Sequence, residues 1–372
     1  MDPAPAPEQS GTQAAPIRSV VAVESARDGI RPAIRRALAA AEWTRVIPAG
    51  ADVALKVNLG WDLFIPGSIT SPAFVEALIE EMRPHVGRII VVESDQVLED
   101  VERAFVLSGM DEVCRRTGAE WHNLGRGESV VVETPANTIL RRIEVPSLLR
   151  RCHLVTVPVM KTHAKTGLSG AIKNQWGCLS KMRHEYHLVL DEALADLNSV
   201  VRPALSVMDA TVALEGNGPK SGWPKIVDGV LCSTDPVALD TVQARIMGLD
   251  PASVGHLARC AARGIGTNRE DAIEVRSTVP LAPCTPFVPA RHNAVSWLET
   301  VLRKSALKRL VFNTPLFYLP LAGAKLYYRL WAWARGGSAW DAVADHPRYG
   351  EAWSRIARPW PMRGRHGERS RA

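Results

Sequence analysis

Short apolar runs alternate with segments of helical spacing from residue 19 onward. A brief apolar run such as 88–93 is typical of a strand buried on both faces, whereas the spacing in 30–41 favours an amphipathic helix. By the same criteria we expect further strands at 19–23, 51–57, 152–159, 204–208 and 227–232, weaker ones at 129–133 and 138–145, and helices at 71–83, 98–107, 110–116, 186–200 and 236–247. Strands that alternate with helices indicate βαβ units. The pattern therefore predicts an α/β fold with a mostly parallel or mixed sheet and flanking helices.

The pattern also divides the chain into four parts. Residues 1–17 are rich in Pro and Ala, and we expect a disordered leader. The α/β domain is predicted to span 18–278, and the Pro-containing segment 279–299 is interpreted as a linker. Residues 300–372 are predicted to form a basic, Trp-rich helical extension.

Charge is distributed unevenly along the 372 residues. The formal net charge is +6, but residues 303–372 alone carry 14 Lys or Arg against 4 Asp or Glu, a net of +10. The remaining residues therefore carry −4. A mildly acidic main body makes nucleic acid an unlikely partner, because nucleic-acid binding needs a basic surface.

The most apolar part of the extension, 310–334, is a poor candidate for a membrane span. Pro315, Pro320, Lys325 and Arg329 interrupt it, and a span needs about 20 predominantly apolar residues. Two interpretations stay open. The helices pack their apolar face on the main domain, or they lie in the plane of a bilayer surface and make a peripheral membrane contact.

The six cysteines lie far apart, and no two have Cys-x-x-Cys spacing. This excludes the usual zinc-ribbon and ferredoxin cluster motifs. With no apolar signal segment at the start, we expect free thiols and a cytoplasmic protein, with the extension allowing peripheral contact at the inner membrane surface. The cysteines are Cys114, Cys152, Cys178, Cys232, Cys260 and Cys284.

The densest cluster of chemically active residues follows the predicted strand 152–159. Lys161, His163 and Lys165 alternate, so in an extended segment they point to one side. Gly167 permits a close backbone approach, and ligands of open α/β sheets bind beyond the carboxyl ends of the strands. Together with Lys173, this segment predicts a site for a carboxylate or phosphate. The alternative is a solvated basic loop.

Carboxylates follow the next predicted strand. Asp209 comes directly after 204–208, and Glu215 and Asn217 lie in a Gly-rich stretch. Two carboxylates at this spacing could hold a divalent cation or act as a general base. The alternative is an ordinary tight turn. Asp240 lies one turn into the predicted helix 236–247, facing either a site or solvent.

Lys56 and Asn58 end the second predicted strand in the same style, although spacing alone favours a structural role for them. The pair His184 and His187 is weak evidence for a metal. Cys178, close to the Lys-rich segment, is either an activated thiol or a packing residue beside Trp176.

These segments together resemble the family of domain of unknown function 362. The match is carried by Lys56-Val-Asn58, Lys161-Thr-His163, Thr166 to Asn174, Trp176-Gly177, His187, Asp196-Leu197, Asp209, Glu215 to Pro219, Asp235 to Asp240 and Met247 to Pro251. Many members join an α/β domain to a ferredoxin module with iron–sulfur clusters. This sequence lacks that module, so the resemblance implies either electrons from a partner protein or chemistry that is not redox. The resemblance also implies that Lys56, Asn58, His187 and Asp240 belong to the site, because they lie in the matching segments.

We therefore expect an enzyme that acts on a small anionic or carboxylate-bearing molecule. Lys161, Lys165 and Lys173 would hold the anion, and His163 would give or take a proton. Asp209 and Glu215 would orient His163 or bind a divalent metal. The other expected binding residues are Lys56, Asn58, Gly167, Asn174, His187, Asn217 and Asp240.

Two alternatives belong to other classes. One is a redox or cofactor-assembly accessory that works with a separate iron–sulfur partner, and it keeps oxidoreductase chemistry open. The other is a membrane-surface scaffold that depends on the extension.

Overall fold

The computed structural model describes residues 18–96, 100–179, 184–291, 293–305, 308–312, 314–356 and 358–359. The expected leader 1–17, the first residues of the helix predicted at 98–107 and the end of the extension lie outside the described residues. Within them, the α/β fold with a mixed sheet is confirmed.

A ten-stranded mixed sheet forms the centre of the described chain, in the order β12-β1-β11-β10-β7-β2-β3-β4, with β8 beside β10 and β9 beside β8. Pairing is parallel from β10 through β7, β2 and β3 to β4, and antiparallel between β1, β11 and β10. The strands are β1 (Ser19–Ser25), β2 (Val53–Lys56), β3 (Ile89–Glu93), β4 (Glu120–Asn123), β7 (His153–Thr156), β8 (Val159–His163), β9 (Gly167–Ser169), β10 (Leu205–Asn217), β11 (Ser221–Ser233) and β12 (Ile273–Arg276). A separate hairpin pairs β5 (Ser129–Glu133) with β6 (Arg142–Pro146).

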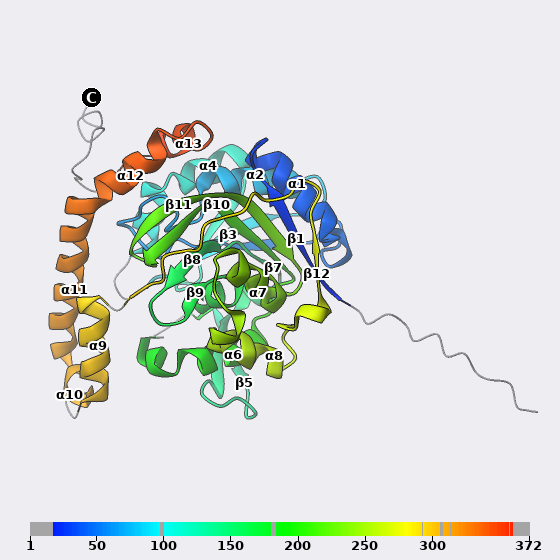
Figure 1. Ribbon diagram of the computed structural model, residues 1–372. Coiled ribbons are helices and arrows are strands. Elements are labelled where there is room, and N and C mark those ends of the chain that lie inside the picture. The colour runs from blue at the N-terminus through cyan, green and yellow to red at the C-terminus, as the bar shows by residue number, and fades with distance from the viewer. Residues whose placement is uncertain are drawn as a thin grey trace, which may run out of the picture.

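Helices cover both faces of the sheet (Figure 1). One hydrophobic core lies under α1 (Ile30–Ala40), α2 (Pro72–Met82), α3 (Val101–Leu107) and α4 (Met110–Thr117). The other lies under α5 (Ala171–Asn174), α6 (Leu190–Val200), α7 (Pro236–Ile246) and α8 (Gly255–Ala262). The central strands are buried on both sides, which explains why 53–55 and 89–92 are continuous apolar runs.

The C-terminal helices run along one side of the body and over its top (Figure 1). They are α9 (Ala294–Lys304), α10 (Lys308–Phe312), α11 (Tyr318–Trp331), a π-helical turn (Ala332–Gly336), α12 (Gly337–Ala344) and α13 (Gly350–Ser354). Trp340 of α12 and Trp353 of α13 are buried in the core that α1 and α2 cover. In the described part of the chain, no helix is both long and apolar enough to cross a membrane.

The hydrophobic pattern misplaced several boundaries. The run 152–159 divides into β7 and β8 around Val157 and Pro158, because Pro158 has no N–H for the ladder. The expected strands 204–208 and 227–232 extend into a long hairpin, β10–β11. Glu215 and Asn217 therefore lie within a paired strand, opposite Trp223 and Ser221, and not in a loop.

Candidate functional site

A small polar cavity lies where the carboxyl ends of β2 and β3 meet β8, β9 and α5. Its volume is about 80 Å³, and Lys56, Asn58, Glu93, Lys161, His163, Lys173 and Asn174 are among the residues that line it. The parallel order β7-β2-β3 brings the strand ends to one edge of the sheet. Ligands bind at this edge in open α/β folds.

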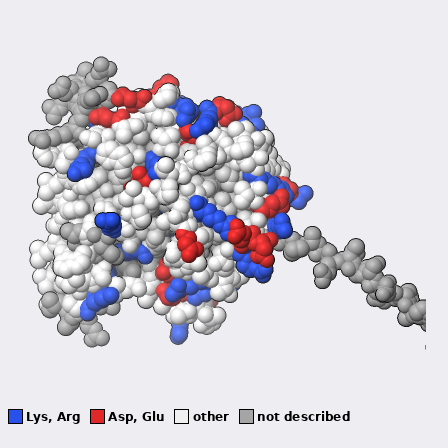
Figure 2. All heavy atoms as spheres, in the orientation of Figure 1, with Lys and Arg blue, Asp and Glu red and all other residues white. Residues whose placement is uncertain are grey.

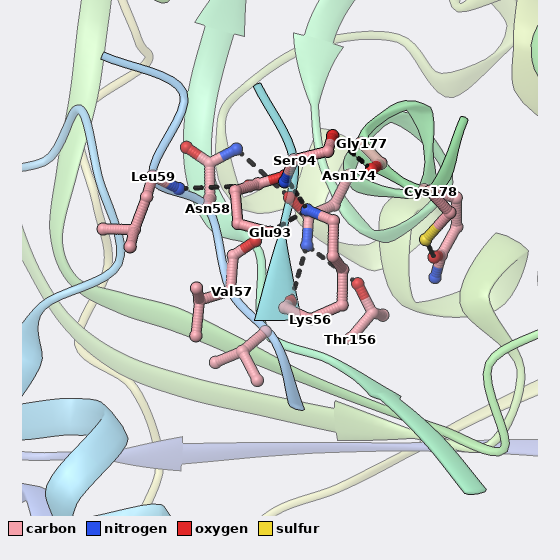
Figure 3. A network of polar contacts seen from close by, with 12 residues as sticks. Lys56, Val57, Asn58, Leu59, Glu93, Ser94, Thr156, Asn174, Gly177 and Cys178 are labelled. Atoms are coloured by element: carbon pink, nitrogen blue, oxygen red, sulfur yellow. Dashed lines mark hydrogen bonds and ion pairs between the residues drawn. The ribbon is translucent and has the colours of Figure 1, made fainter. Parts of the chain in front are cut away.

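A buried ion pair forms one wall of the cavity (Figure 3). Lys56 Nζ lies 2.7 Å from Glu93 Oε1 and donates to the Val57 carbonyl at 2.8 Å. Glu93 also accepts from the backbone N–H groups of Leu59 and Ser94. Both charges are therefore compensated and fixed in place, as buried charges must be.

Two asparagines tie the strand ends together. Asn58 Nδ2 donates to Asn174 Oδ1 at 3.1 Å, and Asn174 Nδ2 donates to the Lys56 carbonyl and to Thr156 Oγ1, both at 2.9 Å. These bonds join β2, β7 and α5. They hold Lys56 and Lys161 in a fixed relation, because Asn58 also contacts Lys161.

Lys161 is a buried lysine of the site whose pKa is strongly lowered. Its Nζ donates to Asn58 Oδ1 at 2.7 Å and to the Ser68 carbonyl at 2.8 Å, and its side chain is buried. Burial, together with the nearby Lys173 and Lys56, lowers the pKa of Lys161 to about 7 against the opposing effect of Glu93. Both protonation states of Lys161 are therefore accessible near neutral pH.

His163 lines the same cavity two residues further along β8. Its Nδ1 accepts from the backbone N–H groups of Lys165 at 3.1 Å and Thr166 at 3.3 Å. An accepting Nδ1 assigns the neutral ring its proton on Nε2. The β8–β9 turn, with Gly167 at φ 75°, sets this orientation.

Asp240 positions the short helix α5, which contributes Lys173 and Asn174. Its carboxylate accepts from the N–H groups of Ala171 at 2.6 Å and Ile172 at 2.9 Å. A Cβ on Gly170 would lie 2.2 Å from Asp240 Oδ1, so glycine is required there. Burial raises the pKa of Asp240 to about 7, against these two hydrogen bonds. Asp240 therefore acts on the site through α5, and it does not itself line the cavity.

Positive charge predominates among the residues around the cavity. Lys56, Lys161, Lys173 and Lys220 line it together with one carboxylate, Glu93. Lys220 Nζ lies 3.6 Å from the ring centroid of Trp61 at the rim. An excess of ammonium groups in a partly enclosed site favours an anion.

A comparison with known protein families shows which family the chain belongs to. The family of the domain of unknown function DUF362 matches residues 53–245, which include every element around the cavity. The chain belongs to the DUF362 family. The resemblance of the sequence motifs is thus confirmed.

Two more distant similarities accompany this DUF362 match. A thylakoid-associated protein of Synechocystis sp. is 34% identical over 113 residues, which is 28% of this chain and 35% of that protein. The chain thus covers about a third of this relative's length. The lactate racemase apoprotein from Thermoanaerobacterium thermosaccharolyticum has a TM-score of 0.36 and 13% identity, over 63% of this chain and 58% of that one. Similarity at that level does not extend to a site or its chemistry.

Several residues expected in the site lie elsewhere. Asp209, in the middle of β10, accepts from Ser71 N at 3.0 Å and from Thr211 Oγ1 at 2.6 Å, and burial raises its pKa to about 6. It does not line the cavity. Of Lys56, Lys161 and Asp209, only the two lysines converge there, because Asp209 fixes the start of α2 instead.

Three more expected site residues make contacts outside the Lys161 cavity, namely Glu215, Asn217 and Lys165. Glu215 pairs with Lys225 at 2.8 Å, and Asn217 accepts from Arg291 N at 3.0 Å. Both line a different cavity, of about 280 Å³, together with Trp331. Lys165 pairs with Glu299 of α9 at 2.6 Å. The side chain of His187 lies outside the described residues.

The structure adds residues that sequence reasoning missed. Glu93 ends the apolar strand β3 and had a detectable signal, an ionisable residue at a strand end like Lys56 on β2. Ser68, Trp61 and Lys220 come from loops and had no local signal. Gly177 lies against the ion pair, and a Cβ there would be 2.5 Å from Lys56 Nζ.

The donor set around the cavity does not fit a divalent cation, because lysines surround its one carboxylate. In the described chain, no group of three or more His, Cys, Asp or Glu is placed to hold a metal. The six cysteines are free thiols, and burial raises the pKa of Cys114 to about 11 and of Cys260 to about 12. Cys178 is buried and contacts Gln175.

Proposed function

We propose that this DUF362 protein is an enzyme that binds a small carboxylate-bearing molecule in the Lys161 cavity and transfers a proton to or from it. The observation that carries the proposal is the arrangement around Lys161 Nζ. Two acceptors, Asn58 Oδ1 and the Ser68 carbonyl, fix the amine, and its pKa lies at about 7. A general base or acid works best with a pKa near the operating pH.

The geometry gives each protonation state of Lys161 a role. A neutral amine has two N–H groups, which match the two acceptors, and its lone pair is then left to take a proton. The ammonium has a third N–H, which can donate to a bound anion. Protonation of Lys161 thus converts a base into an anion-binding donor at the same atom.

Neighbouring residues supply binding and orientation. Lys173 and Lys56 add positive charge for the carboxylate, and the ion pair with Glu93 fixes the position of Lys56. His163, with its proton on Nε2, donates a hydrogen bond to the substrate. The volume of about 80 Å³ favours a small acid and not a nucleotide, since pockets for larger ligands measure about 300 Å³ or more.

Proton exchange tests this reaction without knowledge of the substrate. The protein is incubated in D₂O with a panel of 2-oxo, 2-hydroxy and dicarboxylic acids, and proton NMR follows loss of the signal from the C–H next to the carboxylate or to the keto group. In a 2-oxo acid the exchanging C–H is the one next to the keto carbonyl, since the carbon beside the carboxylate carries no hydrogen. We expect exchange with at least one acid, and a loss of about 100-fold in Lys161→Met, the usual effect of removing a general base. Lys304→Gln, on the exposed side of α9, is the matched control. Exchange that persists in Lys161→Met, or no exchange with any acid, would contradict the proposal.

A further inference from the structure

The C-terminal helices expose an unusual amount of apolar surface. Seventeen large hydrophobic residues are exposed in the described chain, and ten of them lie within residues 297–333. This segment covers α9, α10, α11 and the start of the π-helical turn. Such a concentration marks an interaction surface, because scattered single residues are the normal case.

Helix α11 has apolar residues on two opposite sides. Ala324 and Tyr328 face the body, where the Tyr328 ring lies 5.3 Å from that of Trp61. Leu319, Leu326, Leu330 and Trp333 follow one another at helical spacing on the other side, and they are 69%, 58%, 56% and 45% exposed. We call these four residues the outer stripe. Packing on the body accounts for the first side and leaves the outer stripe unexplained.

Helix α9 turns two charged residues toward the body and exposes apolar residues on its outer side. Glu299 faces inward, where it pairs with Lys165 at 2.6 Å and with Arg303 at 2.9 Å. Arg303 is buried, with its guanidinium 4.1 Å from the Phe312 ring centroid. Trp297 and Val301 lie on the outer side and are exposed. A helix at a water-facing surface normally has its apolar side inward.

The charge of this surface indicates which kind of partner can bind to it. Residues 294–335 contain seven Lys or Arg and one acidic residue, Glu299, which is turned inward. In Figure 2 the margin over α11 is mostly uncoloured, with scattered blue spheres. Lys304, Arg329 and Arg335 are exposed on these helices. A second copy of the chain would bring the same positive charge to the contact, whereas an anionic bilayer would complement it.

We propose that α9, α10 and α11 form a docking surface for an anionic lipid bilayer. The outer stripe enters the interfacial region, and the surrounding Lys and Arg contact acidic headgroups. This places the protein on the membrane surface and not across it. The proposal is independent of the chemistry at Lys161.

Flotation with vesicles tests the docking surface. Full-length protein is mixed with vesicles of phosphatidylcholine alone or with about 30% phosphatidylglycerol, a charge density typical of an anionic leaflet. We expect flotation with the anionic vesicles, which weakens in high salt because the headgroup attraction is screened. Leu326→Glu/Leu330→Glu should lose about tenfold or more in vesicle affinity, since it places two anions in the apolar stripe. Both positions are exposed, so folding is retained.

Val106→Glu/Val275→Glu is the matched control, because these exposed valines lie on α3 and β12. It should float like the wild type. The proposal is overturned if the wild type stays at the bottom with anionic vesicles, or if Leu326→Glu/Leu330→Glu floats equally well. A wild-type dimer in sedimentation equilibrium that this variant dissociates would also overturn it, since the stripe would then bind a second copy.

Discussion

The pKa of Lys161 is set by the residues that surround its side chain. A lysine in water stays charged, but here burial and the cations Lys56 and Lys173 disfavour the charged form. The acceptors Asn58 and Ser68 come from the segment after β2. The environment that shifts the pKa of Lys161 therefore includes residues about 100 positions away in the sequence.

The stability of the protein should rise with pH above neutrality because of Lys161. Its pKa is about 7 in the folded state against an ordinary 10.5, so between these values only the unfolded chain binds the proton. The free energy of unfolding then increases by up to about 1.4 kcal/mol per pH unit. Urea unfolding at pH 7, 8 and 9 measures this slope.

Lys161→Met should flatten that pH dependence. The variant removes the titrating group and keeps the length of the side chain. Lys304→Gln should retain the wild-type slope, since Lys304 is exposed. An equal slope in the wild type and in Lys161→Met would show that Lys161 does not titrate in this range.

Six of the residues that the sequence predicts for the site lie around one cavity, and their roles there stay a prediction. Lys56, Asn58, Lys161, His163, Lys173 and Asn174 were expected and do line the cavity. Asp209 and Glu215 were expected beside them because the alternating pattern did not reveal how far β10 continues. The pairing of Glu93 with Lys56 depends on β2 lying next to β3, and local sequence does not specify strand order.

At the scale of elements, short connecting segments fix the positions of the residues that line the cavity. The turn after α5, Gln175–Cys178, brings Gly177 against the Lys56–Glu93 pair, and Ser94 Oγ donates to the Gly177 carbonyl at 2.6 Å. These elements are only a few residues long, so the hydrophobic pattern gave little indication of them. The apolar strands β1, β2 and β3 and the helices α1, α2 and α7, by contrast, were placed from sequence within a few residues.

Gly177→Ala should disrupt the ion pair. A Cβ there would lie 2.4 Å from Glu93 Oε1 and 2.5 Å from Lys56 Nζ, so one of the two charges must move. We expect a loss of about 2–4 kcal/mol in the free energy of unfolding, the range for a disturbed buried pair. Chemical denaturation measures it.

Gly323→Ala is the matched control for this change. It lies within α11, and a Cβ there meets nothing within 4 Å. Alanine should stabilise the helix by about 0.5–1 kcal/mol. If both alanine variants have the same stability, Gly177 does not support the ion pair.

At the scale of the whole molecule, the basic C-terminal region has two kinds of contact. Its last described helices, α12 and α13, belong to the main core, where the Trp340 and Trp353 rings lie 5.9 Å apart. The preceding helices α9 to α11 present the exposed apolar surface. Packing on the body thus accounts for α12 and α13, whereas membrane contact stays a prediction for α9 to α11.

Trp353→Ala should destabilise the protein strongly, because Trp353 is buried in the core shared with α1 and α2. Large-to-small changes of this kind cost about 3–5 kcal/mol. Trp297→Ala, at a tryptophan that is 61% exposed, should change stability by about 0.5 kcal/mol or less. Thermal unfolding of both variants distinguishes the two roles, and similar losses would contradict them.

The central claim is that Lys161 and its neighbours bind a small carboxylate. Isothermal titration calorimetry of the wild type with the carboxylic acid panel, at pH 6 and at pH 9, tests it most directly. We predict binding that is at least about tenfold tighter at pH 6, where Lys161 is protonated, and that is lost in Lys161→Met but retained in Lys304→Gln. Binding of equal strength at both pH values, or undiminished in Lys161→Met, would contradict the account.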